Sequence, residues 1–186
     1  MAQWLVEKTL QGLKELIDEK GRLNILGNEG TLLETECTFF KGATDLEIES
    51  FEKKIKVSLP EDYKTFLKLH NGARIFDLLI YGENVGGGLH ILNLEEIEKY
   101  MQNGFLEPQF IPVAHLLDGC YLLIDKTKMS TDPNYLWFRG FIEYEPMKLN
   151  FEIFLDRYIL CQGANFWEWN IYTAENYYRT HQGDKD

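Results

Sequence analysis

Apolar residues follow a helical period at the beginning of the chain. Four of them recur at spacings of four, three and four, with charged and polar residues between: Val6, Leu10, Leu13 and Ile17. This period places the four side chains on one face of an amphipathic helix, which we expect to end near Gly21. Residues 22–40 then read as short extended pieces around a turn at residues 27–30.

Two further helices are expected between residues 44 and 72. Thr44 and Glu47 have the spacing of a capping box, in which each side chain bonds the backbone N–H of the other residue. The apolar stripe that follows this box consists of Ile48, Phe51 and Ile55. Its 3.6-residue period predicts a helix with one buried face.

The segment "SLPEDYKTFLKLHNG", residues 58–72, predicts the next helix. Ser58 and Glu61 form a second capping-box spacing, with Pro60 in the first turn, where its missing N–H is tolerated. One helical face carries Tyr63, Phe66, Leu67 and His70. Asn71-Gly72 offers a left-handed stop, and His70 is expected to pair with the last carbonyls of the helix rather than to act in catalysis.

From Ile75 onward the pattern changes to short runs rich in β-branched and aromatic residues, separated by Gly, Asn, Asp and Pro. The runs are "IFDLLIYGE", "GLHIL", "FIPVA", "CYLLID" and "NYLWFRGFIEYE". Helical patterns interrupt and follow them, one capped by Asn93 with Glu96 three residues on, and one with a stripe from Phe151 to Ile159. This order predicts an α+β fold, with helices packed on a mostly antiparallel sheet of about five to six strands.

The length and composition indicate one domain over residues 1–182, with a flexible polar tail at 183–186. The N-terminus has no basic region followed by an apolar core, so it does not read as a signal peptide, and the apolar runs are too short to span a membrane. We therefore expect a cytoplasmic protein.

Charge narrows the class of partner. The chain has 30 acidic and 19 basic residues, a formal net charge of −11. Nucleic acid and anionic lipid surfaces reward clusters of Lys and Arg, so neither is an expected partner. The acidic balance favours encounter with a basic protein. The oligomeric state is left open.

No pattern in the sequence indicates a catalytic site, a metal site or a cofactor. The histidines are scattered, and His90 and His115 read as half-buried sheet residues. Cys37, Cys120 and Cys161 are widely spaced and read as free core cysteines. Gly86-Gly87-Gly88 lacks the Lys and Ser/Thr of a phosphate loop and is better explained as a hairpin or bulge.

The order of several segments resembles the SUKH superfamily, which includes the Smi/Knr proteins. The segments are "EIESFEKKIKVSLPEDYKTFLKLHNGA", "GGGLHILNLEEIEKY", "FIPVAHLLDGCYLLID" and "LNFEIFLDRYI". The similarity extends from Thr44 to Ile159. The N-terminal helix and the aromatic C-terminal segment "NFWEWNIYTAENYY" lie outside it, and would either tune partner choice or extend the core. Trp167, Ile171, Ala174 and Tyr178 in that region fit helical spacing, which favours core packing.

The resemblance implies a non-enzymatic protein-binding module. Bacterial members commonly act as immunity proteins that neutralise toxins, often nucleases, of polymorphic toxin systems, and the acidic charge suits a basic toxin domain. Two alternatives remain open: a regulatory or scaffold protein of the cell envelope, and a small-molecule binder with residues 86–88 at the mouth of its site. The expected partner-binding residues are Glu83, Asn84, Asp118, Asp125, Trp137, Glu143 and Glu145.

Overall fold

The computed structural model describes residues 3–116, 119–140, 143–170 and 173–180. Its α-helices are α1 (Leu5–Leu16), α2 (Asp45–Ile55), α3 (Glu61–Leu69), α4 (Leu94–Gln102), α5 (Phe151–Leu160) and α6 (Ala174–Thr180). The described ranges also contain two 3-10 turns, η1 (Asn28–Gly30) and η3 (Phe166–Glu168). The tail predicted at 183–186 lies outside the described residues.

The strands are β1 (Arg22–Leu26), β2 (Leu32–Phe39), β3 (Ala73–Ile80), β4 (Glu83–Gly86), β5 (Leu89–Ile91), β6 (Phe110–His115), β7 (Tyr121–Asp125), β8 (Leu136–Arg139) and β9 (Tyr144–Pro146). Within the described ranges they form one sheet in the order β1-β2-β3-β5-β6-β7-β8-β9, with β4 also paired to β3. Every pairing is antiparallel. The α+β class is confirmed.

The sheet has nine strands in the described part of the chain, more than the five to six that the sequence pattern predicts. The predicted run at residues 75–83 ends within a hairpin whose second strand, β4, has only four residues. The run at 134–145 splits into β8 and β9. Short exposed edge strands carry little hydrophobic alternation, so the pattern merges them with their neighbours.

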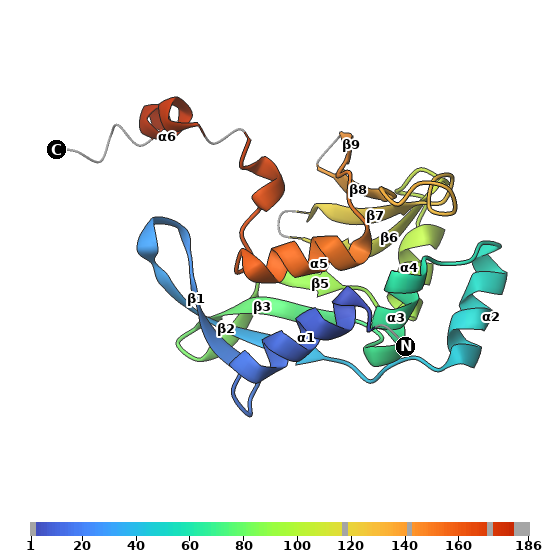
Figure 1. The fold of residues 1–186 in the computed structure, drawn as a ribbon, viewed down its shortest axis with the longest axis horizontal. Coiled ribbons are helices and arrows are strands. Elements are labelled where there is room, and N and C mark those ends of the chain that lie inside the picture. The colour runs from blue at the N-terminus through green and yellow to red at the C-terminus, as the bar shows by residue number, and fades with distance from the viewer. Residues whose placement is uncertain (1–2, 117–118, 141–142, 171–172, 181–186) are drawn as a thin grey trace.

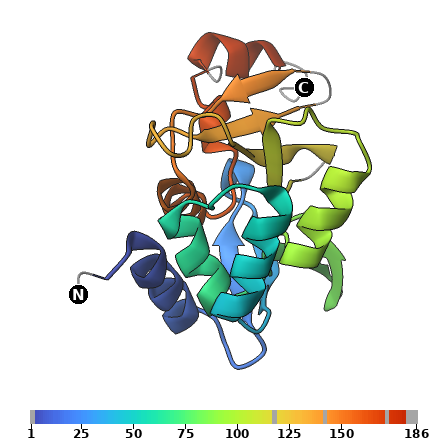
Figure 2. The ribbon, with the colours of Figure 1, turned by 90° about the vertical axis from the view of Figure 1, so that its right-hand side faces the viewer.

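Helices α1, α3 and α5 pack together over one face of the sheet, as Figures 1 and 2 show, while α4 packs on β6. The centre of this layer is aromatic. Tyr63, Phe66 and Phe151 are fully buried, and the ring of Phe151 lies 4.8 Å from that of Tyr63 and 5.2 Å from that of Phe66. Edge-to-face aromatic contacts of this kind add to the hydrophobic stabilisation of the core.

The apolar helix stripes predicted from the sequence are largely buried, but one of the predicted helix caps is not formed. The Thr44 box at α2 and the Asn93 box at α4 are both present. At α3 the residue before the helix is Pro60, and no side chain caps it. The hydroxyl of Ser58 instead donates to the carboxylate of Glu52 at 3.0 Å. Ser58 therefore bonds back to the end of α2 and does not cap the beginning of α3.

His70 is held by two neighbours outside its own helix. Its Nδ1 lies 2.9 Å from the carbonyl oxygen of Phe40, and its Nε2 lies 2.7 Å from the Nζ of Lys14. The carbonyl acceptor requires a proton on Nδ1, so Nε2 accepts from the lysine. The imidazole thus links α1 to the chain before α2, and not to the last carbonyls of α3 as the sequence predicts. Its role is structural.

A buried carboxylate joins α3 to α5. Asp62 is 5% exposed and accepts a hydrogen bond from the Tyr135 hydroxyl at 2.6 Å and from the backbone N–H of Glu152 at 3.1 Å. The Tyr135 oxygen in turn accepts from the N–H of Phe151 at 3.1 Å. These contacts satisfy N–H groups of the first turn of α5. The positive end of the helix dipole also stabilises a carboxylate at this position.

A second, smaller cluster lies on the opposite face of the sheet. It comprises Phe110, Tyr121 and Leu123, with Tyr100, Leu106, Trp137 and Tyr144 packed against them. Arg139 crosses this cluster, with its guanidinium 4.1 Å from the ring centre of Phe105 and 5.5 Å from that of Tyr144. In the described ranges, no helix is both long and apolar enough to cross a membrane.

Candidate functional site

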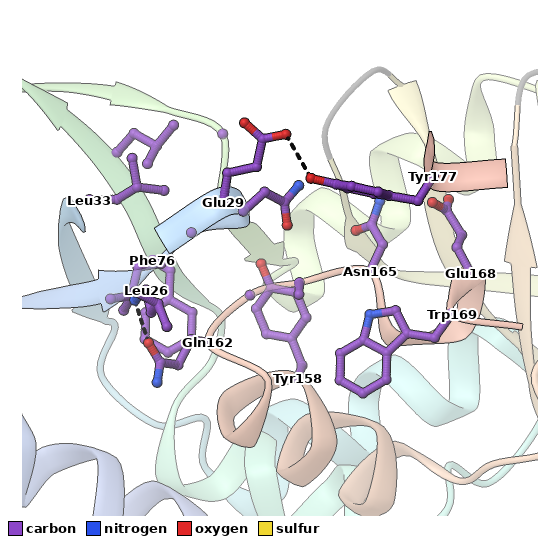
Figure 3. Close-up of a pocket in the computed structure, with 17 residues that line it drawn as sticks. Leu26, Glu29, Leu33, Phe76, Tyr158, Gln162, Asn165, Glu168, Trp169 and Tyr177 are labelled. Atoms are coloured by element: carbon purple, nitrogen blue, oxygen red, sulfur yellow. Dashed lines mark hydrogen bonds between the residues drawn. The ribbon is translucent and has the colours of Figure 1, made fainter. Parts of the chain in front are cut away.

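A cleft of about 660 Å³ opens between the β1–β2 hairpin and the chain that follows α5. The hairpin contributes Ile25 to Glu29 and Leu33, and the C-terminal side contributes Tyr158, Gln162 to Asn165, Glu168, Trp169 and Tyr177. Phe76 and Leu78 line it from β3, and Gly87 lines it from the segment between β4 and β5. Figure 3 shows that side chains from these separate segments point toward a common space. The volume lies within the usual range of binding pockets.

The floor of the cleft is aromatic and buried. The rings of Phe76 and Tyr158 stack with centres 6.0 Å apart, and their side chains are 4% and 3% exposed. Phe76 has a φ of 63°, an unusual value for a bulky residue, where the register of β3 is irregular. Such a bulge turns a side chain out of the normal alternation of a strand. Here it presents the ring of Phe76 to Tyr158.

Backbone strain gathers around this cleft. Six non-glycine residues of the described chain have positive φ, and three of them line the cleft: Glu29, Phe76 and Gln162. The Gln162 side chain accepts the N–H of Leu26 and so fastens the hairpin to the end of α5. Gly163 beside it has a φ of +83°, and an added Cβ would lie 3.2 Å from Phe76. Strained conformations persist where surrounding contacts fix them, as they do here.

The rim carries negative charge and exposed aromatic surface. Trp169 and Tyr177 are 56% and 40% exposed, and Glu29 and Glu168 stand beside them. The Tyr177 hydroxyl donates to Glu29 Oε1 at 3.3 Å, which links α6 to the hairpin (Figure 3). Among the described residues that line the cleft, these two glutamates are the charged ones, and none is cationic.

Tyr158 keeps the floor of the cleft uncharged. Burial raises the pKa of its phenol, and the backbone hydrogen bond from Leu89 only partly opposes this effect. The phenol is therefore neutral at physiological pH. Charge in the cleft is confined to the rim.

The glycine triplet adjoins this cleft and is explained by backbone geometry. Gly86 and Gly87 have φ values of +75° and +93°, and a Cβ on Gly88 would lie 2.3 Å from the carbonyl oxygen of Ile75. The N–H of Gly88 donates to Asp77 at 3.2 Å. Because β4 and β5 both pair with β3, the triplet is an irregular, bulge-like break between two strands on the same edge of β3, which agrees with the predicted hairpin or bulge, and Gly87 lies at the cleft.

The partner-binding residues predicted from sequence are not gathered in one place. Glu83 and Asn84 lie exposed on β4, and the Asn84 side chain donates to Glu36 at 3.0 Å. Glu143 and Glu145 are exposed at β9, which is separated from β5 by β6, β7 and β8. Because β4 and β5 pair with the same edge of β3, four steps of about 4.8 Å between neighbouring strands separate β4 from β9. The two pairs of residues therefore lie roughly 20 Å apart across the sheet.

Two other predicted residues are largely taken up by internal contacts, and one cannot be placed. Asp125 is 4% exposed and accepts from the N–H and the hydroxyl of Thr127 at 2.9 and 2.6 Å. Trp137 is half-buried, with the Nζ of Lys128 4.9 Å from its ring centre. Because Trp137 pairs with Pro146 while Phe138 pairs with Glu145, its ring and Glu145 lie on opposite faces of the sheet. Asp118 lies outside the described residues.

The described histidines and cysteines do not form a metal site. No group of three or more potential metal ligands occurs within the described ranges. His90 and His115 are half-buried sheet residues, as predicted; they pair across β5 and β6, and His90 Nε2 lies 3.3 Å from Glu96. The three cysteines are free, with Cys37 buried and the other two half-buried. Burial raises the pKa of the Cys37 thiol to about 11, so it is unreactive at neutral pH.

Sequence reasoning missed the cleft because its walls are distant in the chain. The predicted helical packing of the C-terminal aromatic segment is correct only for its beginning, where Phe166 and Trp167 contact Phe154. Trp169 follows η3 at the surface, and Tyr178 on α6 is 56% exposed; Ile171 lies outside the described residues. The mixture of Asn, Glu and Trp in this stretch is the signal that could have indicated surface exposure, since Asn and Glu are seldom fully buried.

Comparison with known proteins gives one family and two relatives. The model of the SMI1 / KNR4 family (SUKH-1) matches residues 42–157. The uncharacterized protein YobM of Bacillus subtilis (strain 168) is 51% identical over 180 residues, 94% of this chain and 97% of YobM. The uncharacterized protein YnaB of the same organism is 32% identical over 139 residues, 73% of this chain and 89% of YnaB. Of the residues lining the cleft, only Phe76, Leu78 and Gly87 fall within the family match.

Proposed function

The chain belongs to the SMI1 / KNR4 family (SUKH-1), and from that premise we propose that it is a non-enzymatic protein-binding module. In this proposal it acts in the cytoplasm as an immunity protein, and neutralises a cognate toxin of a polymorphic toxin system by covering the toxin's active domain. Family membership is the observation that carries the proposal. The formal net charge of −11 supports a basic partner, such as a nuclease domain.

The negative charge has a kinetic consequence for such a protein. Opposite charges on two proteins accelerate their encounter, and the effect weakens as salt screens them. An inhibitor must capture its toxin before the toxin acts, so a fast association rate is useful. The exposed carboxylates on β4 and β9 would contribute to this long-range attraction even though they do not form one patch.

The proposal is tested with the toxin gene expected beside the gene for this chain. Co-expression of the two proteins should restore growth, and the pair should elute as one complex in size-exclusion chromatography. An association rate that falls steeply between low and physiological salt would support the charge argument. Absence of both growth protection and a complex would rule out the immunity role.

The cleft favours a second candidate function, that of a small-molecule binder. Its volume of about 660 Å³ and its buried aromatic floor are typical of ligand pockets. A thermal-shift screen against small cationic and aromatic compounds distinguishes the two roles. A ligand that raises the melting temperature in a saturable way would favour this candidate.

A further inference from the structure

We propose that the cleft binds a cationic side chain, an arginine or a lysine, that projects from the surface of the partner protein. This inference rests on the proposed function, because it specifies which chemical group of the partner the module would hold. The cleft is lined by the β1–β2 hairpin, the end of α5 and the C-terminal segment.

Charge complementarity is the first argument. Glu29 and Glu168 are the charged residues among the described lining, which includes no Lys, Arg or His. Glu168 is half-buried, and within the described ranges its carboxylate has no hydrogen-bond or ion-pair partner. Such a carboxylate can accept charge-assisted hydrogen bonds from an incoming cation without giving up an existing partner.

Aromatic surface is the second argument. Trp169 follows Glu168 directly, and Figure 3 shows its ring at the cleft, on the same side as Tyr158. Tryptophan is the aromatic residue that attracts cations most strongly through its ring face. A guanidinium group can lie against such a ring while it donates hydrogen bonds to a carboxylate. The rim therefore offers both kinds of contact that an arginine uses.

The rim also indicates that the cation belongs to a protein rather than to a free small molecule. Leu26 and Trp169 are 60% and 56% exposed, on opposite sides of the cleft. A free ligand of ordinary size would sit on the floor and leave this apolar rim in water. A protein surface around the bound side chain would cover the rim, as around the central residues of protein interfaces.

Position in the chain is the third argument. Most of the lining lies outside the part matched by the family model, whereas β3 and most of α5, on which the cleft is built, lie within it. Contact residues outside the shared part can differ between proteins that share a fold but hold different partners. A cleft lined mostly by the segments before and after the match offers contact residues of this kind.

The test uses the whole protein and a defined probe. The probe is the capped tripeptide acetyl-Gly-Arg-Gly-amide, compared with the same peptide in which citrulline, a neutral isostere, replaces arginine. The readout is the indole N–H signal of Trp169 in ¹⁵N-labelled protein, assigned by its loss in Trp169→Phe. Trp4, which is also exposed but is not among the residues lining the cleft, provides an internal control.

We expect a saturable shift of the Trp169 signal with the arginine peptide, and none with the citrulline peptide. The double substitution Glu29→Gln and Glu168→Gln should weaken peptide binding about tenfold, because it removes both charges. The matched control, Glu143→Gln with Glu145→Gln, changes the net charge by the same amount at β9 and should leave binding unchanged. Equal weakening by both double variants would overturn the proposal, as would an equal response to citrulline.

A third probe, methylguanidinium, tests the source of the cation. If this free ion binds more tightly than the arginine peptide, the cleft is a small-molecule site and the proposal fails. The toxin assay is a separate readout. If the unsubstituted protein binds the arginine peptide but does not protect growth, the immunity role alone is ruled out. Full protection and unchanged complex affinity in the Glu29→Gln, Glu168→Gln variant would remove the role of the cleft alone.

Discussion

Tyr63, Phe66 and Phe151 in the helical layer are fully buried, whereas Trp169 and Tyr177 at the rim of the cleft expose 56% and 40% of their surface. Both groups are aromatic, yet only the first can contribute its full hydrophobic surface to folding. The rim aromatics instead leave apolar area in water, next to carboxylates with no cation in the described lining. This contrast separates a region that stabilises the protein from one that is available for contact.

The same contrast applies to the acidic residues. Asp62 is buried and accepts hydrogen bonds from the Tyr135 hydroxyl and from the N–H of Glu152. The Tyr135 oxygen in turn accepts the N–H of Phe151. Glu168 is half-buried and has no such partner within the described ranges. One carboxylate is therefore part of the architecture, and the other is left to be satisfied from outside. The predictions below test this division, beginning with the largest expected effect.

Replacing Phe66 by Ala should have the largest effect on stability. The ring is fully buried, and its centre lies 5.2 Å from that of the Phe151 ring, so its removal leaves a cavity at the centre of the helical layer. We expect the free energy of unfolding to fall by about 3–5 kcal/mol, measured by urea denaturation. Leu46→Ala on α2, at a side chain that is 77% exposed, is the control and should change it little. Similar losses in both would contradict the assignment of the core.

Replacing Asp62 by Ala should have the next largest effect. Tyr135 and the N–H of Glu152 would lose a buried acceptor, which costs roughly 2–3 kcal/mol. A double-mutant cycle with Tyr135→Phe separates this contact from other effects, and the two losses should be strongly non-additive. Glu49→Ala, at an exposed carboxylate near Lys53, serves as the control. Additive losses would mean that the two groups act independently.

Acid should weaken the helix-and-sheet body through its histidines. Burial is the main cause that lowers the pKa of His70, His90 and His115 below the ordinary value of 6.5. Protons therefore bind the unfolded chain more readily than the folded one, so stability present above about pH 6.5 is lost as the pH falls below it. The melting temperature should decline between pH 7 and pH 5.5, and less so in His70→Gln. A melting temperature that rises on acidification would contradict this.

Replacing Trp169 by Ala should have the smallest effect on stability. The side chain is mostly exposed, and we expect the free energy of unfolding to change by less than about 1 kcal/mol. Binding of the arginine peptide should nevertheless be lost, because the ring face is removed. The two measurements together define a contact residue. A large loss of stability would instead assign Trp169 to the core, and the comparison between the two regions would fail.

The helical layer could be predicted from sequence because its signals are local. The stripes of α1, α2, α3 and α5 follow the helical period, and the residues they name are mostly buried. The SMI1 / KNR4 family was recognisable from the same segments. Most of the predicted partner-binding residues are acidic, and an acidic side chain is not always exposed. Asp125 shows this most clearly, since Thr127, two residues away, occupies its carboxylate.

The sequence by itself determined the α+β class, the family and the faces by which the helices pack, since periodicity and capping act between residues a few positions apart. Only the tertiary structure decided that Glu29 lies beside Tyr177, and that Asp62 lies beneath Tyr135. It also decided that a left-handed Phe76 meets Tyr158 at the floor of a cleft. These pairs are separated by 73 to 148 residues, and no local pattern records which distant segments a folded sheet will bring together.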